Sequence, residues 1–240
     1  MSKGQPGTLV GVGLGPGDPE LLTLKAVRHI ESAQVIAYPA AEGTPSFARS
    51  IAAGYLRDDH IEYAMEMPMT AERFPAQNVY AKGAQLLGRH LSAGRKVAVL
   101  CEGDPFFYGS FMYLFGRMAE HYPTEIVPGV SSFTACAAAA KFPLTARNDV
   151  LTVLPGPLTN QQLAEHLAFG EAFVIPKVGR HLARLKTLLA DNDLLDKATY
   201  IERASLANQV VMPLADVAIE SAPYFSMILV HRRGNAYDEG

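Results

Sequence analysis

The sequence is poor in cysteine, with two residues, Cys101 and Cys136, among 240. Neither belongs to a CxxC pair and both lie inside apolar segments. A zinc-binding or redox role is therefore not indicated, and buried free thiols are expected. The seven histidines are scattered without the spacing of metal ligands, so we expect no metal site in the protein.

The chain also lacks an excess charge of one sign and a long apolar run. It has 21 Lys and Arg against 24 Asp and Glu, a formal charge of -3, which gives no overall field to hold a nucleic acid. No stretch approaches the roughly 20 apolar residues that span a bilayer, and residues 1–7 lack the apolar core of a signal peptide. A soluble, cytoplasmic protein with no membrane or nucleic-acid partner is expected.

The first half of the chain alternates β-branched runs with segments of helical period, which is typical of βα units around a mostly parallel sheet. Asp18 is expected to cap the first helix, with Pro19 at its first position and Leu21, Leu22 and Leu24 in its apolar stripe. Strands are expected near residues 8–12, 35–38, 61–65, 97–100 and 125–127. Further helices are expected near residues 46–56, 72–91, 110–121 and 131–141.

In the second half several strands follow one another without a helix between them, which predicts a mixed sheet. These strands are expected near residues 150–154, 172–175, 198–202, 209–212 and 225–231, with helices near 161–169 and 181–189. A break at residues 142–149 contains Pro143, which ends the preceding helix. The fold class expected is therefore two α/β domains, residues 1–145 and 146–240.

Three turns rich in glycine and proline stand where apolar strands end: residues 11–19, 103–109 and 128–132. The carboxyl ends of parallel strands meet at one edge of a sheet, where bare backbone can approach a small ligand. The turns predict a shared ligand site.

The spacing within these turns excludes several common sites. A dinucleotide-binding GxGxxG fails because Pro16 stands at the sixth position from Gly11, and the Lys and hydroxyl of a P-loop are missing. A serine nucleophile in GxSxG is not indicated, because Phe133 replaces the last glycine.

In their order and spacing, the three turns together with the run at residues 202–205 resemble the tetrapyrrole methylases, a family of two-domain methyltransferases that use S-adenosylmethionine. The resemblance covers nearly the whole chain and implies a ligand cleft between the two domains. Longer stretches, residues 101–114, 131–137, 151–156 and 222–230, resemble the members that methylate carbon 20 of precorrin-2 in corrin biosynthesis. A cobalt-loaded substrate, an RNA or protein substrate, and a ligand-binding module without catalysis remain alternatives.

The resemblance implies site residues, position by position. Expected cofactor contacts are Gly103, Asp104, Phe107, Tyr108, Ser131, Ser132, Lys177, Val178, Ala204, Tyr224, Phe225, Ser226 and Met227. The first turn is expected to line the tetrapyrrole trough through Gly13, Gly15, Pro16, Gly17 and Asp18. Because the substrate carries many carboxylates, cations are expected beside it, with candidates Arg147, Lys177, Arg180, Arg184 and Arg203. Asp104 and Tyr108 are the candidate catalytic residues, and the family implies a homodimer.

Overall fold

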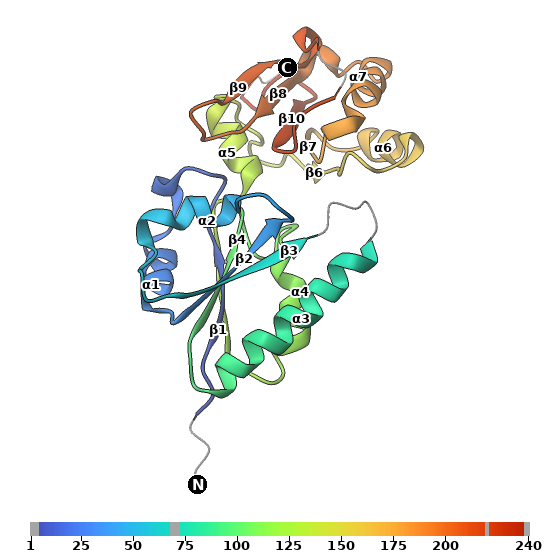
Figure 1. The fold of residues 1–240 in the computed structure, drawn as a ribbon. Coiled ribbons are helices and arrows are strands. Elements are labelled where there is room, and N and C mark those ends of the chain that lie inside the picture. Colours follow the sequence, from blue (N-terminus) through green and yellow to red (C-terminus); the bar gives the residue numbers. More distant parts are fainter. Residues whose placement is uncertain (1–4, 68–72, 219–220, 238–240) are drawn as a thin grey trace. The chain divides into compact units, whose positions relative to one another are not determined.

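The computed structural model describes residues 5–67, 73–218 and 221–237. The chain forms two compact units, residues 1–131 and 132–240, each with its own sheet and helices (Figure 1). The expected fold class, a mostly parallel first sheet and a mixed second sheet in an α/β protein, is confirmed.

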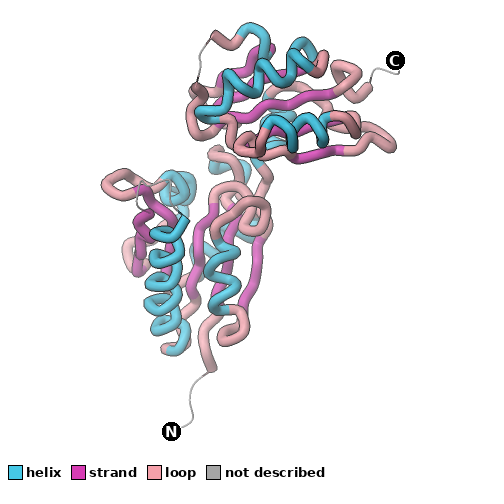
Figure 2. Tube along the Cα trace, turned by 90° about the vertical axis from the view of Figure 1, so that its right-hand side faces the viewer, coloured by secondary structure: helices cyan, strands magenta, loops and turns pink. Residues whose placement is uncertain are grey.

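The first unit contains a five-stranded sheet of order β3-β2-β4-β1-β5. Its described strand pairs are all parallel, and Figure 2 shows these strands side by side in magenta. The strands are β1 Leu9–Gly13, β2 Val35–Ala41, β3 Ile61–Met67, β4 Val97–Cys101 and β5 Thr124–Val127. Since the strands are parallel, their carboxyl ends share one edge of the sheet.

Helices cover both faces of this sheet, as the alternation of residues along β4 requires. Ala98 and Leu100 pack with α1 and α2, whereas Val97, Val99 and Cys101 pack with α3 and α4. The helices are α1 Leu24–Ser32, α2 Phe47–Ala52, α3 Arg73–Ser92 and α4 Phe111–Met118, with short 3₁₀ turns η1 Pro19–Leu21 and η2 Ala53–Tyr55. A strand buried on both faces reads as a continuous apolar run, which is why β4 was evident in the sequence.

The start of the first helix differs from the expectation. Asp18 caps only the turn η1, and a second cap, the Thr23 hydroxyl accepting from the Ala26 amide, begins α1. The extended backbone between them resets the helical phase, so Leu24 is 79% exposed and lies outside the core. The expected start of α3 at residue 72 lies outside the described residues.

The second unit contains a five-stranded sheet of order β6-β7-β10-β8-β9. The pair β6·β7 is parallel and the other three pairs are antiparallel, which makes the sheet mixed as predicted. The strands are β6 Leu151–Val153, β7 Ala172–Pro176, β8 Ala198–Glu202, β9 Val210–Pro213 and β10 Ser226–His231. Because β7 and β8 both run antiparallel to β10, their carboxyl ends flank the start of β10.

One face of this sheet is covered by α6 Asn160–Leu167 and α7 Leu182–Asp191, and the other by α5 Ser132–Ala139. Cys136 of α5 packs with Val174, Ile201 and Leu229. For this reason the units divide at residues 131 and 132, earlier than the predicted boundary at 145 and 146. The remaining short turns are η3 Gly179–His181, η4 Leu195–Lys197 and η5 Leu214–Asp216.

Both cysteines are free and buried, as expected. Burial raises the pKa of both thiols, that of Cys136 to about 12. Within the described ranges, no helix has the length and apolar character that crossing a membrane requires.

Candidate active site

The first two turns of the first unit are joined by hydrogen bonds beyond the ends of β1 and β4. The Gly103 amide donates to the Gly15 carbonyl at 2.8 Å, and the Gly15 amide donates to the Gly103 carbonyl at 3.2 Å. The Leu14 amide donates to the Cys101 carbonyl at 2.9 Å. The predicted meeting of these two turns is therefore a feature of the structure.

The third turn reaches the other two through glycine backbone. A Cβ added to Gly13 would overlap the Gly129 backbone, and one added to Gly129 would overlap the Gly103 carbonyl oxygen. Backbone segments packed this closely leave no room for a side chain. Residues 13–18, 103–109 and 128–131 thus form one surface at the carboxyl edge of the sheet, which we call the glycine edge.

Gly103 differs from its two glycine neighbours on this edge. Its φ of +65° favours glycine, yet no atom of the described residues lies within 4 Å of where its Cβ would stand. The backbone at Gly103 therefore faces open space, and a ligand can approach it directly.

Asp104 fastens the second turn to the third. One carboxylate oxygen accepts from the amides of Phe106 and Phe107 at 2.9 and 3.1 Å, and the other accepts from the Gly129 amide at 3.1 Å. Three backbone donors on one carboxylate are a strong, directional tie. This geometry gives Asp104 the task of shaping the edge, and its contact with a cofactor stays a prediction.

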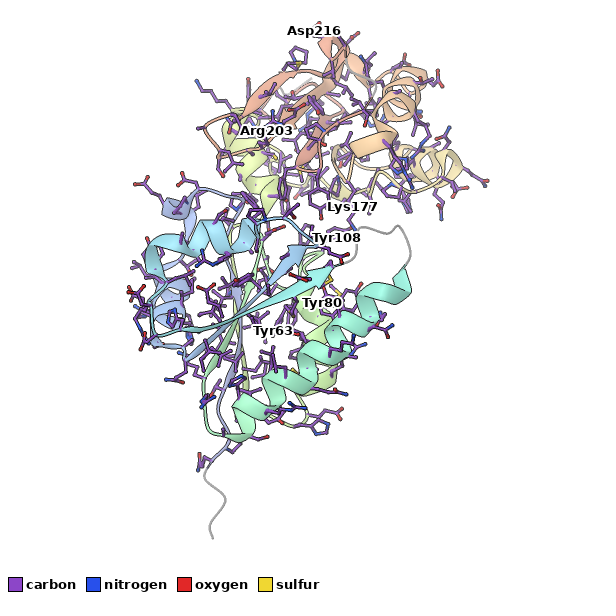
Figure 3. All side chains as sticks on the ribbon, viewed as in Figure 1. Tyr63, Tyr80, Tyr108, Lys177, Arg203 and Asp216 are labelled. Carbon is purple, nitrogen blue, oxygen red and sulfur yellow. The ribbon has the colours of Figure 1, made fainter. Side chains whose placement is uncertain are left out.

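Phe107 and Tyr108 form a pair of exposed aromatic rings on the glycine edge. Phe107 and Tyr108 are 37% and 48% exposed, and their rings meet edge to face with centroids 5.0 Å apart. Tyr108 is labelled in Figure 3. Tyr108 has a φ of 55°, in the left-handed region that is uncommon for a non-glycine residue. Such strain often marks a ligand site.

In the first turn, the Asp18 carboxylate accepts from the Glu20 amide at 2.9 Å. Gly13, Gly15 and Gly17 are buried, while Pro16 and Asp18 are partly exposed. Their predicted role along a tetrapyrrole trough stays a prediction.

The second unit gathers its predicted cofactor residues at one edge of its own sheet. Lys177 follows β7, Arg203 follows β8, and Phe225 precedes β10. The Arg203 amide donates to the Phe225 carbonyl at 2.8 Å, so two of these loops are joined. We call residues 177–178, 203–205 and 224–227 the left-handed edge (Lys177 and Arg203 are labelled in Figure 3).

The name reflects the backbone there. Lys177, Arg203 and Ser205 have φ values of 60°, 48° and 71°. The described chain has seven non-glycine residues with positive φ. Four of them are among the site residues expected from the sequence: Tyr108, Arg147, Lys177 and Arg203. Two others, Lys141 and Asp193, simply end helices, which is an ordinary place for this conformation.

The side chains of the left-handed edge are mixed in exposure. Val178, Ala204, Ser226 and Met227 are buried, and Tyr224 is 84% exposed. The Ser226 hydroxyl donates to the Pro223 carbonyl at 2.7 Å. Hence the edge offers an apolar floor with backbone groups and an exposed aromatic ring above it.

Arg203 already has partners in its own unit. Its Nη2 lies 2.6 Å from Oε2 of Glu202, and its Nε donates to the Asn208 carbonyl at 3.1 Å. Glu202 is 7% exposed and also accepts from the Tyr200 hydroxyl at 2.7 Å. Burial and this carboxylate raise the pKa of Tyr200. The arrangement assigns Arg203 to holding its loop, so its predicted contact with substrate is not needed to explain its position.

Among the other predicted cations, Arg184 donates to Asn160 and to the Gly156 carbonyl, whereas Arg180 is exposed. Arg147 is exposed on an open cavity of about 680 Å³ within the second unit. The neighbouring Asp149 accepts from the Ala146 amide at 2.8 Å and meets His231 and Arg233 at 3.3 and 2.9 Å.

Ser131 is partly exposed and ends the first unit, and Ser132 is exposed and begins α5. The division between the units therefore falls between these two serines, both of which are expected cofactor contacts in the third turn. Glu102, adjacent to Gly103, lies within the resembling stretch at residues 101–114 and is not among the site residues expected from the sequence. Its burial and bonding, described below, are what distinguish it, and neither is visible in the sequence.

No group of three or more metal-binding side chains is found in the described part of the chain. The described edges thus offer backbone groups, apolar and aromatic side chains, and a few carboxylates. This set suits an uncharged or cationic organic ligand held by shape.

These features define a class of protein: an α/β ligand-binding protein whose candidate sites lie at the carboxyl ends of strands. The family model described as Tetrapyrrole (Corrin/Porphyrin) Methylases matches residues 8–218. The chain belongs to this family, which confirms the resemblance carried by the three turns.

Individual relatives match along the full length. A precorrin-2 C(20)-methyltransferase from Sinorhizobium sp is 43% identical over 238 residues, covering 96% of this chain and 97% of the relative. A cobalt-precorrin-2 C(20)-methyltransferase from Salmonella typhimurium is 33% identical over 230 residues, covering 95% of this chain and 97% of the relative. A solved uroporphyrin-III C-methyltransferase from Thermus thermophilus, complexed with S-adenosylhomocysteine, is similar with a TM-score of 0.66 at 24% identity, covering 93% of this chain and 97% of that chain.

Proposed function

We propose that this chain transfers a methyl group from S-adenosylmethionine to carbon 20 of precorrin-2, giving precorrin-3A in cobalamin biosynthesis. The observation that carries the proposal is the 43% identity to a precorrin-2 C(20)-methyltransferase over 96% of the chain. The cofactor is supported by the family and by the similar Thermus thermophilus structure, which is complexed with S-adenosylhomocysteine.

Each edge, taken by itself, has groups that suit such a cofactor. Bare backbone faces open space at Gly103, and the left-handed edge supplies the buried apolar side chains Val178, Ala204 and Met227. Backbone groups can hydrogen-bond an adenine and a carboxylate, and apolar side chains can cover the rest. When bound, S-adenosylmethionine supplies a methyl group already activated by its sulfonium charge.

The residues then have little chemistry to perform. A reduced tetrapyrrole presents a nucleophilic meso carbon, so alignment of this carbon with the methyl group and exclusion of water supply much of the rate enhancement. Phe107 and Tyr108 would cover a macrocycle from the glycine edge, because their rings are exposed there. Arg147 and Arg180 are exposed cations that would meet its carboxylates.

A cobalt-loaded substrate is the second candidate, and the 33% identity to a cobalt-precorrin-2 C(20)-methyltransferase supports it. The test is anaerobic incubation with S-adenosylmethionine and either precorrin-2 or its cobalt complex, followed by mass spectrometry and NMR of the product. We expect one methyl group at carbon 20 of the metal-free substrate. Transfer only to the cobalt form would select the second candidate, and transfer to neither would refute the proposal.

A matched pair of variants separates binding at the glycine edge from general stability. Gly103→Ala and Gly43→Ala both place a Cβ at positive φ, 65° and 72°, and neither Cβ would meet an atom of the described residues within 4 Å. Both variants should lose about 1 to 2 kcal/mol of stability from the left-handed backbone. Only Gly103→Ala should also weaken cofactor binding, measured by calorimetry with S-adenosylhomocysteine.

A homodimer and a cytoplasmic location complete the proposal. The family resemblance supports the first, and the biosynthetic role of the relatives supports the second. Light scattering of the purified protein should give twice the chain mass of 25.9 kDa.

A further inference from the structure

Two carboxylates flank Gly103: Asp104 belongs to the glycine edge, and Glu102 directly precedes Gly103 in the chain. They differ in their bonding. Asp104 accepts hydrogen bonds from three backbone amides, as described above. Glu102 has no hydrogen bond or ion pair to any described residue. Within the described chain, one carboxylate is therefore committed to structure, and the other is available to bond a ligand.

The position of Glu102 is fixed by its neighbours. Cys101, on one side, is the last residue of β4 and is 3% exposed. Gly103, on the other side, is locked to Gly15 by a pair of hydrogen bonds. The backbone that bears Glu102 is thus rigid, as a group that must meet a reacting atom requires.

Burial raises the pKa of the Glu102 carboxyl. The acidic groups beside it along the turn are Cys101 and Asp104, and it has no cationic partner among the described residues. A carboxylate without a partner and partly withdrawn from water is a stronger base than an ordinary one. It is also the usual environment of a catalytic acid or base.

We propose that Glu102 is the proton acceptor of the methyl transfer. This assignment rests on the proposed function and adds a catalytic residue to it. Tyr108, a candidate catalytic residue from the sequence, lies on the neighbouring glycine edge as an exposed ring.

The step balances as follows. Carbon 20 forms a bond to the methyl carbon with an electron pair of the macrocycle, while the bond from sulfur to the methyl carbon breaks and its pair stays on sulfur. Carbon 20 then carries both the methyl group and its original hydrogen, and the macrocycle has gained one positive charge. Glu102 takes that hydrogen as a proton, and the electrons of the broken C–H bond restore the conjugation of the ring.

The test compares wild type with Glu102→Gln, using Glu120→Gln, an exposed carboxylate beyond α4, as the matched control. We expect Glu102→Gln to lower kcat by about 10² to 10⁴-fold, with S-adenosylhomocysteine affinity within about twofold of wild type. Deuterium at carbon 20 should slow Glu102→Gln more than wild type, because proton loss becomes rate-limiting. Glu102→Asp should recover part of the rate, and Glu120→Gln should behave as wild type.

The pH profile gives a second readout with a defined sign. The base must be ionised, so the kcat of wild type should fall as the pH drops through the raised pKa of Glu102, and Glu102→Gln should lose this acidic limb. A kcat within about threefold of wild type, with an unchanged isotope effect, would overturn the proposal. So would a loss of rate that is matched by a loss of S-adenosylhomocysteine affinity, since this would make Glu102 a binding group.

A third readout does not require activity and separates this inference from the proposed function. With ¹³C-labelled glutamate, the signal absent from the Glu102→Gln spectrum should titrate above the ordinary carboxyl value of 4.5. If wild type methylates no precorrin-2, the proposed function fails. The titration still decides whether the pKa of the Glu102 carboxyl group is raised. Titration at the ordinary value would refute the assignment of Glu102 whatever the substrate.

Discussion

The glycine edge and the left-handed edge both hold backbone in unusual geometry, and they use different residues to do so. On the glycine edge, Gly13 and Gly129 allow close approach because a Cβ would not fit. On the left-handed edge, Lys177 and Arg203 adopt positive φ despite having side chains, and Arg203 is held by Glu202 and the Asn208 carbonyl. The glycine edge depends on the absence of side chains, whereas the left-handed edge depends on polar contacts of side chains. Substitutions should therefore destabilise the two edges for different reasons.

The largest effect is expected from filling the glycine edge. Gly129→Ala would drive a Cβ into the Gly103 carbonyl oxygen and should lower the free energy of unfolding by roughly 2 to 3 kcal/mol. Gly116→Ala is the matched control, because its Cβ would meet no described atom and alanine favours the helix α4. Denaturant titration measures both variants. Equal stability of the two would contradict the close-approach account.

The next effect concerns the polar tie within the glycine edge. Asp104→Asn should cost about 2 kcal/mol, because an amide nitrogen replaces an oxygen that accepts from backbone donors. Asp18→Asn, which alters the acceptor for the Glu20 amide, should stay within about 0.5 kcal/mol, since asparagine also caps well. Thermal unfolding and S-adenosylhomocysteine titration check the pair. An Asp104→Asn protein with unchanged stability and affinity would remove any role for this carboxylate.

The dependence of the second unit on ionised side chains predicts a response to pH. The Ala146 amide, with Arg233 and His231, holds the pKa of Asp149 below its ordinary value of 3.8. A depressed carboxyl pKa adds stability above the ordinary value, and this stability is lost as the pH falls through the folded value. Asp149→Asn should therefore be less stable than wild type near neutral pH, with a difference that shrinks below about pH 4. Melting curves between about pH 6 and pH 3 would show this convergence, and a constant difference would contradict it.

The smallest effect is expected from relieving the left-handed edge. Lys177→Gly removes the strain of a φ of 60° and should raise stability by up to about 1 kcal/mol. S-adenosylhomocysteine affinity should fall slightly, because a more flexible loop must be ordered on binding. Asp193→Gly, at the end of α7, should gain similar stability without any change in affinity. If both variants bind alike, Lys177 has no part in the ligand site.

The sequence was sufficient for the features that depend on period and composition. Buried strands such as β4 read as apolar runs, and the turns of the glycine edge read as glycine and proline after a strand. Side-chain polarity and spacing are local properties, and so they can be read directly from the sequence. The residues of the left-handed edge were expected through family resemblance, because the identity of Lys177 or Arg203 does not indicate a positive φ.

Two errors have the same origin in tertiary packing. Helix α5 is made almost entirely of small and apolar residues, so its period cannot show which sheet it covers, and the boundary was placed too late. Leu24 was assigned to the apolar stripe because the second cap at Thr23 was not recognised. Glu102 was overlooked as a site residue for a related reason: burial and the absence of a partner in the described structure belong to the fold.

The two buried thiols also provide a kinetic probe for each unit. Cys101 lies in the sheet of the first unit, and Cys136 lies on the face of α5 that packs against the sheet of the second. A thiol reagent reaches either one only when the surrounding structure opens, so the rate of labelling measures how often that unit opens. Because each unit carries one such residue, a single labelling time course can follow the opening of both units separately, without any added probe.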